Sequence, residues 1–341
     1  MSLSTESVPS DGSVKSSFRL RCLHPLLLLA AQSRILVGGQ AVIEGVMMRV
    51  PGAYAVAVQD PEGTVQTQYQ EFTSAVESSR WLKFPVVRGV IHLFESLKIG
   101  LATLNWSAEV AYPDEAPKKG SASSLLTTTL ALALGIGLFF VAPLWITTKL
   151  LQLEQQALGF NLVSGAFRIT FFLIYLTAIS FMKDVRRLFE YHGAEHMTVY
   201  TFEAGQQLTV ENTRAFPTQH PRCGTSFIFI VLIAAILTFA LIDTAVLAII
   251  GRMSLGLRLL VHLPLIPLVA GISYEVLKIT AKYQKVFLLR WLSLPGLWLQ
   301  YITTRVPDDD QLNVALESLK VAFGERLPEV EGKQFVADAI A

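Results

Sequence analysis

Two histidines four residues apart, with a glutamate beside the second, are the strongest chemical signal in this sequence. They lie in the segment EYHGAEHMTVY, residues 190–200, as His192, Glu195 and His196. On a helix, residues four apart share one face, so both imidazoles can reach a single ion. The order His-x-x-Glu-His reverses the zincin pattern, in which two histidines hold zinc and a glutamate activates a water. The sequence therefore predicts a site for zinc or another divalent metal, with Glu195 as the catalytic base.

A metal site needs more than two donors, and a second segment supplies candidates. TQHPRCGTSF, residues 218–227, contains His220 and Cys223, whose nitrogen and sulfur atoms suit zinc. Glu275 is an alternative ligand, because ionisable groups inside an apolar span are usually functional. The predicted metal ligands are therefore His192, His196, His220 and Cys223, with Glu275 in reserve.

Each of these residues also has an ordinary structural interpretation. The histidine pair could consist of interfacial polar residues that stack on aromatic rings, and Cys223 could be an inert small residue at a helix start. Glu275 could form an ion pair with Arg290 or Arg88. The remaining histidines are isolated in the sequence, and we interpret all of them as structural: His24, His92 and His262.

Long apolar windows dominate the middle of the chain. Only 16% of the 341 residues are charged, against about 25% in soluble domains, and a bilayer is crossed by about 20 apolar residues. Together these observations predict a mainly α, integral membrane fold with about four transmembrane helices. The windows are Leu125–Leu151, Val163–Met182, Phe227–Ile250 and Leu257–Ile279, within a membrane domain over residues 125–282.

The positive charges that flank these windows predict the orientation. They cluster at residues 118–119, 183–187 and 278–285, and cytoplasmic segments carry the excess of Lys and Arg. The N-terminus, residues 183–224 and the C-terminus are therefore expected in the cytoplasm. Arg252 and Arg258, on the opposite side, argue mildly against this orientation. The predicted metal site then lies in a cytoplasmic loop, residues 183–224, close to the membrane surface.

The local structure of the histidine motif can also be predicted. No proline separates the second window from the motif, so the second helix is expected to continue through it. Gly193 lies between the two histidines and is a poor helix former. We expect it to let another segment approach the helix backbone closely.

The remaining segments are shorter and more polar. Residues 1–34 read as a variable leader, 35–75 as a small β-rich region, and 109–124 as a linker. Residues 79–108 predict an amphipathic helix on the bilayer surface, and the interrupted window 286–304 predicts an interfacial or re-entrant segment. Residues 308–341 predict a soluble tail with a helix capped by Asp310 or a neighbour. Three polar residues of the β-rich region are expected to cover the metal site: Gln40, Glu44 and Arg49.

Composition excludes two classes of protein. The net charge is +1, so there is no basic field that would favour a nucleic-acid partner. The two cysteines, Cys22 and Cys223, lie far apart and do not form a disulfide framework. The partners that remain are the lipid bilayer, an unknown substrate and a possible membrane protein complex.

Four motifs in this order resemble the YqhQ-like bacterial membrane protein family, a domain of unknown function that is also found in photosynthetic lineages. The motifs are GGQAVIEGVMMR, YHGAEHMTVYTFE, HPRCGTSF and GISYE, and the resemblance covers roughly Gly38 to Pro307. It implies a metal-dependent enzyme centred on His192, His196 and Glu195, without naming a substrate. It also implies a bacterial plasma membrane, or a thylakoid or plastid membrane in a photosynthetic lineage.

Three functions agree with these observations. The first is a zinc enzyme, most simply a hydrolase, that acts at the cytoplasmic membrane face on a peptide, a lipid head group or an isoprenoid-like molecule. The second is a non-catalytic scaffold or assembly factor with a structural metal site, and the third is a transporter. Four converging protein ligands would favour the scaffold, whereas three ligands with Glu195 near an open position would favour the enzyme.

Overall fold

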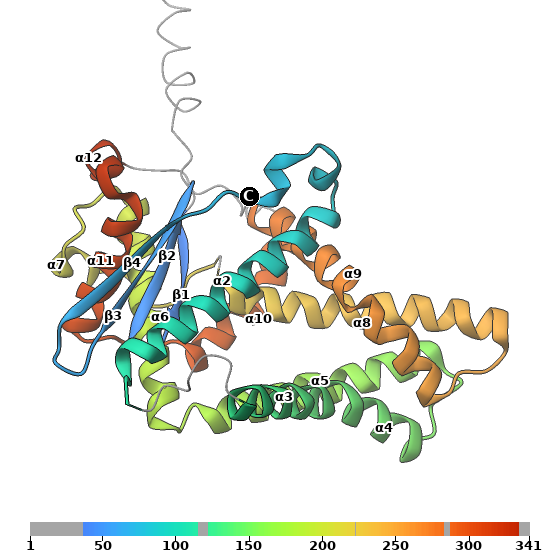
Figure 1. The fold of residues 1–341 in the computed structure, drawn as a ribbon. Helices are drawn as coiled ribbons and strands as arrows, with labels where there is room; N and C mark the ends of the chain where they lie inside the picture. The colour runs from blue at the N-terminus through green and yellow to red at the C-terminus, as the bar shows by residue number, and fades with distance from the viewer. Residues whose placement is uncertain (1–36, 115–121, 222, 283–286, 334–341) are drawn as a thin grey trace, which may run out of the picture.

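The computed structural model describes residues 37–114, 122–221, 223–282 and 287–333. Within them, a four-stranded sheet and its covering helices lie on one side of the molecule, and α4, α5, α8 and α9 extend to the other (Figure 1). The predicted leader, residues 1–34, lies outside the described residues, as do residues 115–121 of the predicted linker.

The sheet is an antiparallel meander in the order β1-β2-β3-β4. Tight turns join its neighbouring strands, and the glycine at the β2–β3 turn, Gly52, has a φ of 86°, which other residues rarely adopt. The prediction of a small β-rich region is therefore confirmed. The strands are Gly38–Val42, Gly45–Val50, Ala53–Gln59 and Val65–Glu71.

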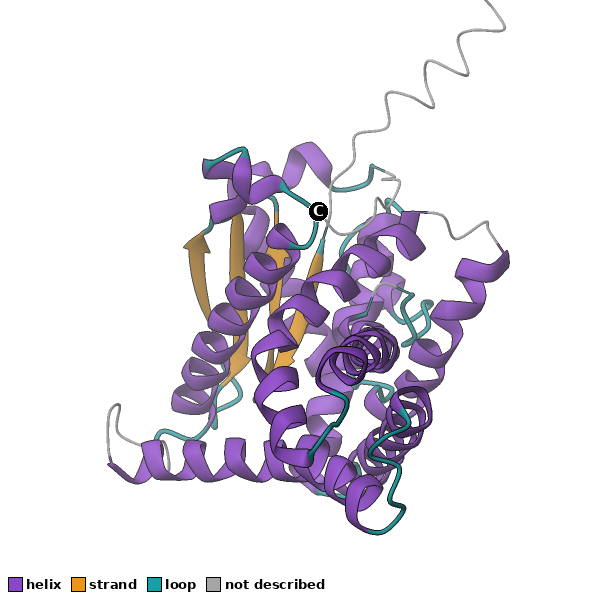
Figure 2. Cartoon of the chain, turned by 90° about the vertical axis from the view of Figure 1, so that its right-hand side faces the viewer, coloured by secondary structure: helices purple, strands orange, loops and turns teal. Residues whose placement is uncertain are grey.

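Helices pack on both faces of the sheet, and successive side chains along a strand point to alternate faces. On one face, Val46, Met48 and Ala55 pack with α6 (Lys183–Glu203) and α11 (Asp309–Phe323). On the other face, Met47 and Val56 pack against α2 (Val87–Ala111). Figure 2 shows the strands side by side with helices in front of them. The sheet therefore lies between α6 and α2.

The helix expected in the C-terminal tail is present as α11, and it packs on the sheet. The apolar face of α11, with Leu312, Leu316 and Leu319 buried, forms part of the same core as the sheet. Its N-cap is Asp308, which forms a capping box with Gln311. The sequence predicted Asp310 or a neighbour as the cap, and the neighbour Asp308 has this role. Short helices flank α11: α7 (Val210–Thr213), a 3-10 turn at Gly324–Arg326 and α12 (Leu327–Val330).

Helix α2 begins later than the range 79–108 predicted. Pro85 lies two residues before its first residue, and two 3-10 turns, Ala75–Ser78 and Trp81–Lys83, occupy the preceding segment. The helix packs against α9 (Leu255–Lys282) as well as the sheet, at a close contact between Gly89 and the Gly271 carbonyl. Its placement at a membrane interface stays a prediction.

Among the described residues, four helical segments are long and apolar enough to cross a membrane, which confirms the prediction of about four such helices. The first comprises α3 (Ala122–Ile136), a π-helical turn (Gly137–Val141) and α4 (Ala142–Lys149). The others belong to α5 (Ala157–Ile179), α8 (Gly224–Ile250) and α9. The candidate spans are Leu126–Lys149, Ala157–Ile179, Phe227–Ile250 and Leu255–Ile279.

The histidine motif does not continue the second span, which corrects that expectation. Helix α5 ends at Ile179, and Met182 has extended backbone angles before α6 begins at Lys183. Within the predicted connection between the second and third spans, α6 occupies Lys183–Glu203. The interrupted window forms α10 (Phe287–Thr303), which packs along α8 and is not among the candidate spans of the described residues.

Candidate metal centre

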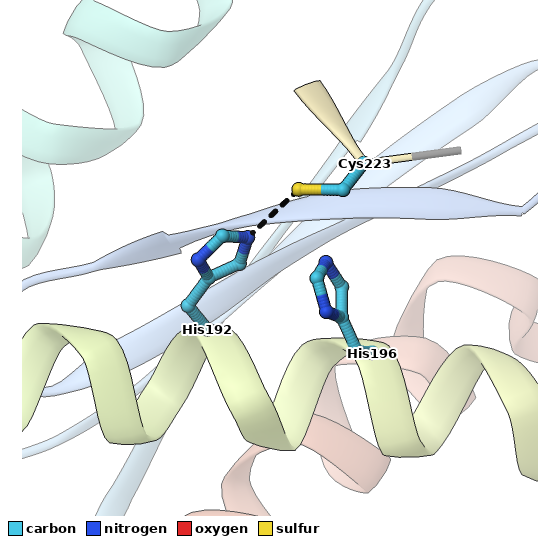
Figure 3. Close-up of side chains that lie close together, drawn as sticks. All are labelled: His192, His196 and Cys223. Carbon is cyan, nitrogen blue, oxygen red and sulfur yellow. Dashed lines mark hydrogen bonds between the residues drawn. The ribbon is translucent and has the colours of Figure 1, made fainter. Parts of the chain in front are cut away.

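Helix α6 places the predicted histidine pair on one face. The ring centroids of His192 and His196 are 4.4 Å apart, and both rings project from the same side of the helix (Figure 3). The burial differs, because His192 is partly exposed whereas only 2% of His196 is exposed. The spacing of four residues thus produces the juxtaposition that the sequence predicts.

Cys223 approaches the pair from a different element. It is the N-cap of α8, where its sulfur accepts a hydrogen bond from the Thr225 N–H at 3.4 Å. The same sulfur lies 3.2 Å from His192 Nε2. The donor atoms of His192, His196 and Cys223 all lie within 4.8 Å of one another. We call these three residues the His–His–Cys group.

Backbone carbonyls fix the orientation of both imidazole rings. His192 Nδ1 lies 2.8 Å from the Thr303 carbonyl oxygen, and His196 Nδ1 lies 2.5 Å from the Thr218 carbonyl oxygen. A carbonyl can only accept, so each Nδ1–H donates and each Nε2 is left with a lone pair. Metal-ligating histidines are held in this way in known sites. The two carbonyls therefore orient both rings so that Nε2 of each carries the lone pair that a metal ligand needs.

The geometry of the group fits a metal ion. His196 Nε2 is buried without a hydrogen-bond partner in the described part of the chain, although Glu195 Oε2 lies 3.4 Å away in poorer geometry. In a tetrahedral zinc site, ligand nitrogen and sulfur atoms are about 3.5 Å apart, which is close to the distance between His192 Nε2 and Cys223 Sγ. Burial lowers the pKa of His196, partly offset by Cys223, so its ring stays neutral as a ligand requires.

Glu195 is buried beside the group, with 5% of its surface exposed. Its side chain packs under strand β1, where a Cβ added at Gly39 would lie 3.0 Å from Glu195 Cγ. The sheet therefore covers the predicted base through a glycine, which leaves room for the carboxylate. The catalytic role of Glu195 stays a prediction.

The three polar residues expected to cover the site make other contacts. Gln40 donates to the Gly100 carbonyl of α2, and Arg49 stacks on Phe72. Glu44 accepts from Arg187 Nε at 2.5 Å at the start of α6. Gln40 follows Gly39 along β1 and therefore points to the opposite face of the sheet, where it cannot cover Glu195.

His220 lies next to the His–His–Cys group but outside it. Its ring centroid is 5.7 Å from that of His196, and its Nε2 is 3.7 Å from Glu203 Oε2. Gln300 of α10 clamps its backbone, accepting from its N–H at 2.7 Å and donating to its carbonyl at 2.9 Å. Burial lowers the pKa of His220 to about 4, and the charge of Glu195 offsets this only in part. Its role as a ligand stays a prediction.

The alternative ligand Glu275 is engaged elsewhere. Its carboxylate forms a bidentate ion pair with Arg88 of α2, with Arg88 Nε 2.7 Å from Oε1. This is one of the two ion pairs that the structural interpretation proposed. Glu275 is not part of the His–His–Cys group.

Gly193 allows a close backbone approach, as predicted. A Cβ at this position would lie 2.0 Å from the Arg305 carbonyl oxygen and 3.2 Å from Thr218 Cγ2. The segment after α10 thus crosses α6 between the two histidines. Sequence reasoning missed Thr218, Thr303 and Gln300, because two of them act through backbone carbonyls and side-chain identity does not reveal that role.

Fold and site together define a mainly helical protein with four candidate membrane spans, an N-terminal antiparallel sheet and a buried group of donors suited to a metal. The chain belongs to the family described as protein of unknown function DUF1385, whose profile matches residues 84–325. It is 32% identical over 294 residues to the uncharacterized protein YqhQ of Bacillus subtilis (strain 168), covering 82% of this chain and 90% of that protein. The comparison with solved structures finds no match.

The comparisons confirm the family to which the motifs pointed. The resemblance was expected to cover roughly Gly38 to Pro307, whereas the family profile begins at residue 84, after the motif GGQAVIEGVMMR, and continues to residue 325, so that it includes α11. This agrees with the packing of α11 against the sheet and α6.

Proposed function

We propose that this protein is a multi-pass membrane zinc enzyme, a hydrolase that acts at the cytoplasmic membrane face. The observation that carries the proposal is the His–His–Cys group, in which two backbone carbonyls hold Nδ1 of both histidines and leave both Nε2 atoms for a metal. Catalytic zinc sites commonly have three protein ligands and one open position. A set of three donors therefore suits catalysis better than a closed structural site.

The residues around the group have distinct roles in this proposal. Zinc held by His192, His196 and Cys223 would supply a Lewis acid that increases the acidity of a water molecule. Glu195, buried beside His196, would serve as the base that accepts a proton from a water and later returns it to the leaving group. The sheet excludes bulk water from Glu195, because Gly39 packs directly on its side chain.

The orientation completes the proposal. The positive charges at residues 183–187 support a cytoplasmic position for α6 and the metal centre, together with both termini. The substrate then reaches the site from the cytoplasm or the inner leaflet. A peptide, a lipid head group and an isoprenoid-like molecule are the substrate classes to test. The membrane is a bacterial plasma membrane, or a thylakoid or plastid membrane in a photosynthetic lineage.

A non-catalytic scaffold is the second candidate, and one observation favours it. His220 is 4% exposed and its ring centroid is 5.7 Å from that of His196, so a ring rotation could add a fourth donor. Four protein ligands would close the site and leave a structural metal that staples α6 to α8. A transporter is the third candidate, and the metal centre itself gives it no support.

The test compares two variants of the purified full chain. Glu195→Gln keeps shape but removes the base, whereas His192→Ala removes a ligand. Zinc content is measured by elemental analysis, and hydrolysis is measured on panels of peptides, phospholipids and prenyl esters. The enzyme predicts that Glu195→Gln retains zinc but loses hydrolysis by about 10²–10⁴-fold.

A matched control and two contrary outcomes sharpen this test. Glu211→Gln, an exposed glutamate of α7, should leave both zinc content and hydrolysis unchanged. Equal hydrolysis by wild type and Glu195→Gln would reject the catalytic role of Glu195. Absence of zinc from wild type, even after reconstitution, would reject the enzyme and the metal scaffold together.

A further inference from the structure

A second polar cluster lies at the opposite end of the candidate spans from the metal centre. Asp243 of α8 and Arg258 and His262 of α9 are each 0% exposed. These residues lie near the connection between α8 and α9, which Figure 1 shows far from the sheet. A charged cluster of this kind inside apolar helices is costly and usually functional. The metal centre uses none of these residues.

Asp243 is fully engaged as a hydrogen-bond acceptor. Its Oδ2 accepts from Arg258 Nε at 3.0 Å and from Asn161 Nδ2 at 2.7 Å. Its Oδ1 lies 2.8 Å from His262 Nε2, which donates because a carboxylate only accepts. The carboxylate therefore balances the charge of one guanidinium, that of Arg258.

A second buried guanidinium, that of Arg168, forms no ion pair within the described part of the chain. Arg168 of α5 is 4% exposed, and its Cζ lies 4.9 Å from the centroid of the Phe140 ring and 5.9 Å from that of Phe239. Phe239 also stacks on His262, with 4.0 Å between ring centroids, so Arg168 lies one aromatic ring from the cluster. We therefore count Arg168 with the cluster, which then contains two guanidinium groups and one carboxylate.

Several donors of the cluster are buried without a hydrogen-bond partner in the described part of the chain. They include Nε and Nη2 of Arg168 and Nη1 of Arg258, which can only donate. The other unpartnered atoms are Asn161 Oδ1, His262 Nδ1 and Thr148 Oγ1. Buried guanidinium donors without acceptors are unfavourable, so these guanidinium groups suit a ligand that carries oxygen acceptors and negative charge.

A cavity at the end of α4 adjoins the cluster. A cavity of about 350 Å³ is lined by Thr148, Lys149, Gln152, Glu154 and Gln155. The backbone carbonyl of Glu154 accepts from Arg258 Nη2 at 2.8 Å, so the cavity wall and the cluster are in direct contact. Lys149 adds a positive charge at the cavity, which the Glu154 carboxylate opposes.

We propose that this cluster is a binding site for an oxyanion, a carboxylate or a phosphate, which is held by Arg168 and Arg258 and enters beside α4. The planar fork of a guanidinium matches both anions with paired hydrogen bonds. Two sources supply this chemistry, a small soluble anion and the head group of an anionic lipid. The site does not depend on the metal centre, because no residue is shared between them.

The test measures thermal unfolding of the full chain in a neutral detergent. The probes are inorganic phosphate, acetate and phosphatidylglycerol in mixed micelles, with neutral diacylglycerol as the lipid control. A ligand present at 100 times its Kd lowers the unfolding equilibrium constant about 100-fold and raises Tm. A saturable rise with phosphate or acetate identifies a small anion, and a rise with phosphatidylglycerol alone identifies a lipid head group.

Three variants assign the effect to the cluster. Arg168→Gln should abolish the ligand-induced rise in Tm, and Arg168→Lys, which keeps the charge but loses the fork, should weaken it at least tenfold in Kd. Arg252→Gln removes an exposed cation near the same end and should retain the full rise. If Arg168→Gln does not fold, the proposal is tested by the ligand-induced rise in Tm of the wild type and by the Kd of Arg168→Lys. No saturable rise in wild type with any probe, or an equal rise in both Arg168 variants, overturns the proposal.

Discussion

Replacement of Gly193 by alanine should disturb the metal centre without removing a ligand. The added Cβ would lie 2.0 Å from the Arg305 carbonyl oxygen, whereas ordinary contact begins at 3.4 Å, so one partner must move by about 1.4 Å (3.4 − 2.0). Arg305 is also bound to α6, because its N–H donates to the Phe189 carbonyl at 2.9 Å. The segment therefore cannot move freely away from the helix.

The displacement would act on both histidines. Thr303, two residues before Arg305, holds His192 Nδ1, and Thr218, whose Cγ2 would lie 3.2 Å from the new Cβ, holds His196 Nδ1. Loss of the hydrogen bonds that orient ligating histidines typically lowers metal affinity by about 10–100-fold. Overpacking costs about 1–3 kcal/mol, and the better helix propensity of alanine returns about 1 kcal/mol. We expect a net loss of up to about 2 kcal/mol in the free energy of unfolding.

Chelator competition measures zinc affinity, and thermal unfolding of the chelated protein measures stability. Gly135→Ala is the matched control, since nothing lies within 4 Å of a Cβ there, and it should bind zinc as wild type does. Wild-type zinc affinity and Tm in Gly193→Ala would refute the inference that Arg305 and the two threonine carbonyls position the histidine rings.

Three further predictions follow from the structure. Changing both His192 and His196 to alanine should remove about one zinc per chain, as measured by elemental analysis, because it removes two of the three clustered donors. In the chelated protein, His220→Gln should flatten the fall of stability on acidification. Burial lowers the pKa of His220 to about 4, so between roughly pH 6.5 and 4 the unfolded chain binds more protons than the folded chain. The free energy of unfolding therefore decreases as the pH is lowered through this range, by up to about 1.4 kcal/mol per pH unit. An unchanged slope in thermal unfolding across that range would contradict the assigned cause. Finally, a cysteine at exposed Gln156 should react with an impermeant thiol reagent outside intact cells, and one at exposed Gln207 should not; the reverse pattern would invert the proposed orientation.

The candidate spans and the histidine pair could be predicted from sequence because each depends on local pattern. A window of about 20 apolar residues specifies a spanning helix wherever it lies in the chain. The four-residue spacing of His192 and His196 places both rings on one helix face without any tertiary contact. Gly193 was also informative, since a glycine inside a helix suggests close approach of another segment.

The tertiary environment of the site could not be predicted in the same way. Thr303 and Thr218 act through backbone carbonyls, which every residue carries, so their identity holds no signal. The docking of α11 on the sheet depends on packing between segments more than 200 residues apart, as with Ser318, whose hydroxyl donates to the Ala55 carbonyl. Periodicity predicted the amphipathic helix but gave no partner for its apolar face.

The position of His220 bears most directly on the choice between enzyme and scaffold. Gln300 holds the His220 backbone at both its N–H and its carbonyl, so the ring can reach the group only by rotating its side chain. In the structure its Nε2 lies near Glu203, and its ring contacts Tyr200 edge-on with 4.5 Å between centroids. Rotation would give up both contacts. A site with three protein ligands therefore needs less rearrangement of the structure than one with four. Glu195 Oε2 lies 3.4 Å from His196 Nε2, beside these three donors. Three ligands with an open position are typical of catalytic zinc sites, so this arrangement favours the enzyme over the scaffold.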